Sequence, residues 1–266
     1  MRARTPMVVA LVVLQAFGGG VGLAATRTES GFLNRTVAVA GVSRRYQVYV
    51  PAGYTAKRAW PVVLCLHGSG ERGTDGLLQT EIGFGTALRR YSERYPLIAV
   101  FPQCPPDMRW PGAAARIALA TLDATLREFH GDPARIYLSG LSMGGNGAWY
   151  LAYRDPARWA AILVACGWVT PEANHPTAEP VVPESDGAAV GALAAKLRHV
   201  PVWQFHGALD DVISPAHSRA LAAALDSLGA PAKYTELPGV GHGSWDAMYA
   251  SPEVATWLLA QLRPAR

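Results

Sequence analysis

The chain has 266 residues, of which 50% are hydrophobic and only 17% are charged. This balance excludes a disordered chain, and the length allows one large domain or two small ones. The formal net charge of +4 is too weak to indicate a nucleic-acid partner, so none is expected.

The N-terminus carries the pattern of an export signal. Two arginines precede the apolar run MVVALVVLQAF, and small residues follow it in GGGVGLAA. This order is typical of a cleaved secretory signal peptide. We therefore expect a signal peptide over residues 1–25 and a mature domain over residues 26–266 that is secreted or periplasmic. The alternative is an uncleaved N-terminal anchor. No later segment is apolar over a length that spans a bilayer, so stable membrane insertion after cleavage is not expected.

A series of short apolar runs predicts the strands. Residues 34–50 are expected to form two strands joined around Gly41, with alternating Tyr46, Val48 and Val50 in the second. The later runs do not alternate, which is typical of parallel strands buried on both faces. These runs are residues 61–66, 97–101, 135–140, 160–166 and 200–205, and residues 233–237 form a more polar last strand.

Helical patterns separate these runs. Residues 113–130 carry leucines at helical spacing, and residues 215–228 begin with Pro215 behind the capping residue Ser214. Strands that alternate with helices predict a three-layer α/β domain with a mostly parallel sheet and antiparallel N-terminal strands. Only residues 170–190 break the pattern, with four prolines and no helical period. They are interpreted as a short lid or substrate wall, or as a solvated surface loop, so any cap over the sheet is small or absent.

The three cysteines show no spacing typical of a metal site. Cys65, Cys104 and Cys166 each lie at the end of a short apolar run and are interpreted as small buried residues. A bridge between Cys65 and Cys104 is the alternative in an oxidising compartment. No metal and no other cofactor is expected.

The segment from Gly140 to Gly144 has the pattern G-x-S-x-G. A β-rich run leads into it and a helical pattern leads out, which is the setting of a nucleophile elbow. The sharp turn leaves no room for side chains two residues from the serine, and glycines stand at both positions. We predict that Ser142 is a nucleophile.

A serine hydroxyl needs a base within hydrogen-bond reach and a carboxylate that orients this base. On such a sheet the chain order is serine, acid, histidine. Asp210 follows one strand, and His242 follows the last strand between two glycines. We predict Asp210 as the acid and His242 as the base, with Asp211 as the alternative acid or a residue that stabilises the loop. His67 and His206 precede glycines at strand ends and are interpreted as structural.

Two backbone N–H groups are needed to stabilise the oxyanion. One is expected from Met143, which follows the nucleophile, and the other from Ser69 in a glycine-rich loop, with Gly70 as the alternative. Trp110 and Trp245 are candidates for the wall of the substrate pocket, although a place in the core is an equal interpretation for each.

Four segments together resemble the α/β-hydrolase superfamily, and the resemblance covers nearly all of residues 34–263. In particular they are similar to its small secreted branch of carboxylesterases and predicted peptidases, related to dienelactone hydrolases, phospholipase/carboxylesterases and the catalytic domain of prolyl oligopeptidases. The segments are PVVLCLHGSGERG, GLSMGGNGAW, FHGALDDVIS and GVGHGSWD.

The resemblance implies a secreted serine carboxylesterase with Ser142, Asp210 and His242 as the triad, and with Ser69 and Met143 as oxyanion donors. The expected substrates are esters of short acyl chains or esters linked to a polysaccharide. An acyltransferase or a serine peptidase on the same triad is the alternative, and a binding protein that has lost catalysis is a third. The sequence does not indicate an oligomeric state.

Overall fold

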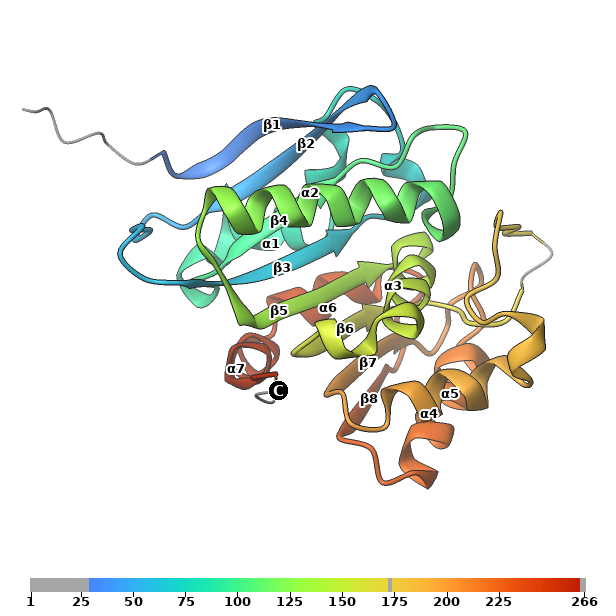
Figure 1. The fold of residues 1–266 in the computed structure, drawn as a ribbon. Helices are drawn as coiled ribbons and strands as arrows, with labels where there is room; N and C mark the ends of the chain where they lie inside the picture. Colours follow the sequence, from blue (N-terminus) through green and yellow to red (C-terminus); the bar gives the residue numbers. More distant parts are fainter. Residues whose placement is uncertain (1–28, 172–173, 264–266) are drawn as a thin grey trace, which may run out of the picture.

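The computed structural model describes residues 29–171 and 174–263. The predicted signal peptide, residues 1–25, lies outside the described residues. The described chain forms an eight-stranded twisted sheet between two layers of helices (Figure 1). In sheet order the strands are β1 (Gly31–Val39), β2 (Val42–Val50), β4 (Ile98–Pro102), β3 (Trp60–Leu66), β5 (Gly131–Leu141), β6 (Ala161–Ala165), β7 (Val202–Gly207) and β8 (Ala232–Leu237).

The strand directions confirm the predicted sheet. β1 pairs antiparallel with β2, and β2 pairs antiparallel with β4. All later neighbours, from β4 through β8, are parallel. The alternation in β2 places Tyr46, Val48 and Val50 in the core on one face of the sheet and Tyr49 in the core on the other. Both faces are therefore buried, as the apolar runs indicate.

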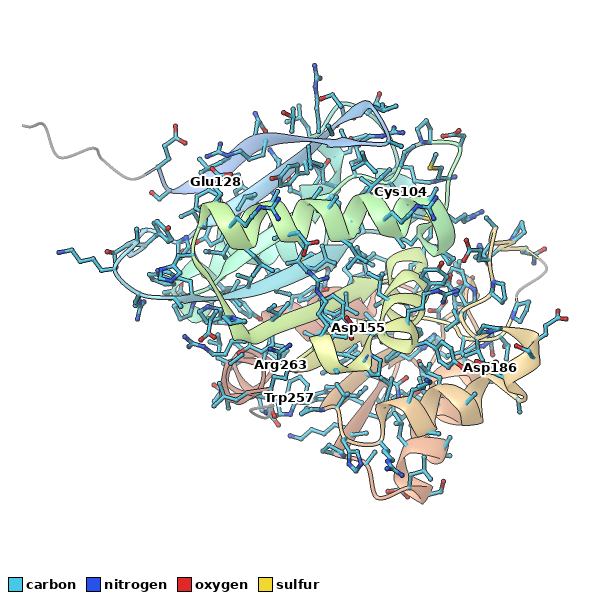
Figure 2. The ribbon with its side chains drawn as sticks, in the orientation of Figure 1. Cys104, Glu128, Asp155, Asp186, Trp257 and Arg263 are labelled. Carbon is cyan, nitrogen blue, oxygen red and sulfur yellow. The ribbon has the colours of Figure 1, made fainter. Side chains whose placement is uncertain are left out.

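Seven α-helices in the described residues form the outer layers. One core cluster packs α2, α3, α4 and α5 against one face of the sheet, and the second packs α1, α6 and α7 against the other. Side chains fill the space between the sheet and both helix layers (Figure 2). The helices are α1 (Phe84–Tyr91), α2 (Ala115–Glu128), α3 (Met143–Arg154), α4 (Ala189–Leu197), α5 (Ala216–Ser227), α6 (Ser244–Ala250) and α7 (Pro252–Ala260). The three-layer α/β-hydrolase fold is confirmed.

The segment at residues 170–190 is packed against α3 over its second half. Val181 and Val182 are buried. Arg154 on α3 donates to the Val181 carbonyl at 3.0 Å and pairs with Glu179 at 3.3 Å. Val181 and Val182 therefore anchor the segment on α3, while residues 184–188 are exposed, and the lid and solvated-loop interpretations both stay predictions.

All three cysteines are buried and free. Their interpretation as small buried residues is confirmed, and the alternative bridge between Cys65 and Cys104 is not formed. None of the helices in the described part of the chain is long and apolar enough to cross a bilayer.

Candidate active site

Ser142 lies at a strained turn between β5 and α3. Its backbone φ is 52°, in the left-handed region that a serine rarely adopts. The Ser142 N–H donates to the Ala165 carbonyl on the neighbouring strand at 3.0 Å, which holds the turn against the sheet. Such strain persists only where the surroundings fix it, and it concentrates at functional sites.

The glycines around Ser142 are required by close backbone contacts. A Cβ on Gly140 would collide with the Gly144 carbonyl, and a Cβ on Gly144 would collide with the Leu66 carbonyl on β3. On α3, Gly147 packs directly against Trp110, where a side chain would have no space. The elbow therefore brings the start of α3 into contact with the central strands.

The structure brings the three residues predicted as a triad into one hydrogen-bonded chain. Ser142 Oγ lies 2.9 Å from His242 Nε2, and His242 Nδ1 lies 2.8 Å from Asp210 Oδ2. Ser142 follows β5, Asp210 follows β7, and His242 follows β8, so all three reach the same edge of the parallel sheet. Ser142 is 9% exposed. With Nδ1–H donating to the carboxylate, Nε2 is free to accept the serine proton.

Asp210 is fixed by more contacts than the sequence indicates. Its Oδ1 accepts hydrogen bonds from the Val212 and Ile213 N–H groups, each at 2.9 Å. The Asp210 side chain is fully buried, whereas Asp211 is exposed. The loop-stabilising bonds that we considered for Asp211 are therefore made by Asp210 itself.

A second histidine, His206, also contacts Asp210. Its Nε2 lies 2.9 Å from the Ile213 carbonyl and 3.2 Å from Asp210 Oδ2, and its Nδ1 lies 2.8 Å from Ser218 Oγ. Burial lowers the pKa of this imidazole. Both ring nitrogens are thus occupied, as expected of a structural histidine.

His67 is likewise fully satisfied. Its Nδ1 donates to the Gly68 carbonyl at 2.7 Å, and its Nε2 accepts from the Cys104 N–H at 3.0 Å. Burial lowers the pKa of His67 to about 4, so the ring is neutral near pH 7. It is a structural residue of the loop that carries Ser69.

The two amides predicted to bind the oxyanion belong to residues close to Ser142. Met143 is the first residue of α3, and an N–H in the first turn of a helix has no carbonyl partner within the helix. Ser69 begins a short 3₁₀ turn beside Gly68, and a Cβ on Gly68 would lie 3.8 Å from Ser142 Cβ. The roles of both amides stay predictions.

The two tryptophans have different surroundings. Trp110 is fully buried, and its Nε1–H donates to the His67 carbonyl at 2.9 Å. Its assignment to the substrate pocket is therefore corrected, because Gly147 opens a space in the core that the indole fills. Trp245 is partly exposed, with its ring centroid 5.3 Å from that of His242, so its role at the pocket remains a prediction.

One group of side chains here has the residue types of a metal site. Cys166, Asp210 and His242 offer ligand atoms within 4.8 Å of one another. Metals bind the thiolate form, but burial raises the pKa of the Cys166 thiol well above its ordinary value. The Asp210 and His242 atoms are also engaged with each other. The chemistry of this donor set fits a proton relay better than a metal ligand set.

Comparison with known proteins identifies a family and several solved structures that this chain is similar to. The model of the prolyl oligopeptidase family matches residues 109–263. A solved thermostable esterase is 30% identical, with a TM-score of 0.72 over 87% of this chain and 63% of that one. A ferulic acid esterase of the anaerobic fungus Anaeromyces mucronatus is 17% identical, with a TM-score of 0.63 over 88% of this chain and 94% of that one.

A curated relative is an uncharacterized secreted protein of Arthroderma benhamiae, 27% identical over 205 residues. The match covers 68% of this chain and 21% of the relative, so the chain spans about a fifth of that protein's length.

Proposed function

Since the chain belongs to the prolyl oligopeptidase family of α/β-hydrolases, we propose that this serine hydrolase cleaves carboxylic esters through an acyl-enzyme on Ser142. The observation that carries the proposal is the hydrogen-bonded chain from Ser142 through His242 to Asp210. The 30% identity with a thermostable esterase favours an ester over a peptide as the substrate.

In the proposed first half-reaction, Ser142 Oγ attacks the ester carbonyl carbon while its proton passes to His242 Nε2. The carbonyl oxygen becomes an oxyanion that the N–H groups of Met143 and Ser69 stabilise. The intermediate collapses when the bond to the alcohol oxygen breaks and His242 returns the proton to this oxygen. The alcohol leaves, and the acyl group remains on Ser142.

Water completes the cycle by the same steps in reverse. His242 Nε2 accepts a proton from the water, whose oxygen attacks the acyl carbon, and the proton then returns to Ser142 Oγ as the acid leaves. Throughout, Asp210 holds His242 in the tautomer with its proton on Nδ1 and stabilises the imidazolium that forms. If an alcohol takes the place of water in this step, the same residues perform acyl transfer.

The proposed substrates are soluble short-chain acyl esters or esters linked to a polysaccharide. Within the described part of the segment at 170–190, Val181 and Glu179 contact Arg154 on α3, the helix that begins after Ser142 (Figure 1). A cap no larger than this segment leaves an open site, which suits a soluble substrate. Export of the mature chain is part of the proposal, supported by the N-terminal pattern and by the relative named as a secreted protein.

A substrate panel tests this function. The mature protein and its Ser142→Ala variant are assayed on 4-nitrophenyl acetate, butyrate and octanoate, on acetylated and feruloylated oligosaccharides, and on a prolyl peptide. The proposal expects cleavage of short-chain or sugar esters by the parent protein, with none by Ser142→Ala. Faster cleavage of the peptide than of every ester would favour a peptidase. Formation of a new ester with an added alcohol, in preference to hydrolysis, would favour an acyltransferase.

A further inference from the structure

Two cavities are lined by arginines from the loops that follow β3 and β4 and from β2. The first, of about 460 Å³, is lined by Arg72 and Arg109, and the second, of about 270 Å³, by Arg44 and Arg45. The chain passes directly from one wall to the other, because residues 72 and 106 line the first cavity and residues 73 and 105 line the second. We call these two neighbouring cavities, with Arg44, Arg45, Arg72 and Arg109 in their walls, the arginine track.

The first cavity is tied to the loop next to the nucleophile. Arg72 Nε donates to the Ser69 carbonyl at 2.9 Å, and Arg109 Nη1 donates to Ser69 Oγ at 3.2 Å. Ser69 adjoins Gly68, which lies against Ser142. A group bound by these two arginines therefore lies next to the bond that Ser142 is proposed to attack.

The positive charges of the track are not neutralised by the protein. Within the described ranges, none of the four arginines forms an ion pair, although Asp107 also lines the first cavity. Burial lowers the pKa of Arg109, and the charge of Arg72 lowers it further. Holding two like charges together at a partly buried site is unfavourable, and an anion placed between them removes this cost.

One residue in the wall of the second cavity has an unsatisfied donor. Arg44 Nε is buried and has no hydrogen-bond partner in the described structure. Such a donor typically finds a partner in water or a ligand. The guanidinium group matches a carboxylate, which accepts two of its N–H bonds at once.

We propose that the track binds an acidic polysaccharide, a chain of sugars with repeated carboxylates, and presents an ester on that chain to Ser142. This inference rests on the proposed esterase function and specifies its substrate. Two adjoining cavities with two arginines each suit a repeating anion better than a single small carboxylate. The ester chemistry of the neighbouring site favours a polysaccharide over a nucleic acid as the polyanion.

Binding is measured directly, so that it does not depend on catalysis. Oligogalacturonate of about eight sugars is titrated calorimetrically into the Ser142→Ala protein, with a neutral xylo-oligosaccharide of equal length for comparison. We expect binding of the acidic oligosaccharide only, and affinity that falls as NaCl screens the arginines. Arg44→Gln with Arg45→Gln should weaken it at least about tenfold, the factor supplied by one charge-assisted hydrogen bond.

A matched control removes the same charge elsewhere. Arg90→Gln with Arg127→Gln changes two exposed arginines outside both cavities and should leave the affinity within about twofold. An equal loss in this control would show that only net charge matters and would overturn the proposal. Equal affinity for the neutral oligosaccharide, or for a single-stranded oligonucleotide of the same charge, would also overturn it.

The two proposals fail in different ways. If the parent protein hydrolyses 4-nitrophenyl butyrate but Ser142→Ala binds no oligogalacturonate, the track is wrong and the esterase function stands. If oligogalacturonate binds but no ester is cleaved, the esterase function fails, and with it the presentation of an ester to Ser142.

Discussion

Replacing Asp210 with asparagine separates the two tasks of this carboxylate. Oδ1 accepts the N–H groups of Val212 and Ile213, which shapes the loop, while Oδ2 orients His242. An asparagine oxygen can still accept the two N–H bonds, but its amide nitrogen donates and cannot accept from Nδ1–H. His242 then takes the wrong tautomer, and we expect kcat to fall roughly 10⁴-fold with little unfolding.

Alanine at the same position removes both tasks. The Ile213 N–H is buried, and a buried donor without an acceptor costs about 1–3 kcal/mol of folding free energy. Asp210→Ala should therefore lose this stability in addition to the rate. Asp211→Ala is the matched control because that residue is exposed, so its free energy of unfolding should stay within about 0.5 kcal/mol.

The assay combines initial rates on 4-nitrophenyl butyrate with urea unfolding of each variant. If Asp210→Asn kept more than about a tenth of the parent kcat, the carboxylate would not be orienting the base. If Asp211→Ala proved the more damaging change, our choice of acid would be wrong.

Three further predictions concern the surroundings of the site. The pKa of His67 is about 4 in the folded chain, below its ordinary 6.5. The neutral ring therefore makes its full contribution to the free energy of unfolding above pH 6.5, and this contribution is lost as the pH drops toward 4. The loss is roughly 3 kcal/mol, and urea unfolding of His67→Gln should show a flatter pH dependence. Gly144→Ala should abolish activity by collision with the Leu66 carbonyl, whereas Gly191→Ala, in open space on α4, should raise the melting temperature slightly; an active Gly144→Ala protein would contradict the elbow geometry. EDTA should leave ester hydrolysis unchanged because the Cys166 thiol stays protonated, and a loss restored by added zinc would refute this.

Much of the fold follows from local patterns in the sequence. The apolar runs predict the parallel strands because strands buried on both faces have no polar alternation, and the bounds of β3 and β4 agree with the prediction within one residue. Gly140 and Gly144 predict the elbow because the turn leaves no room for side chains there, and in the structure each of them faces a backbone carbonyl. The order of Ser142, Asp210 and His242 then places them at one sheet edge.

Contacts between distant segments could not be predicted in this way. Arg72 and Arg109 meet at Ser69 only because the loops after β3 and β4 fold over the same edge. Trp110 is a candidate for the pocket wall by its residue type, but the space that buries it is made by Gly147 on another element. Such pairings depend on tertiary packing, which carries no periodic signal in the sequence.

The central claim is that Ser142 forms a covalent acyl-enzyme, and labelling tests it most directly. The protein is treated with a fluorophosphonate, digested, and analysed by mass spectrometry while hydrolysis of 4-nitrophenyl butyrate is followed. We expect one added label per chain, on the peptide that contains Ser142, in step with the loss of activity. Ser142→Ala should take up none. Full inactivation with the label on another residue, or activity that persists after Ser142 is fully labelled, would contradict the account.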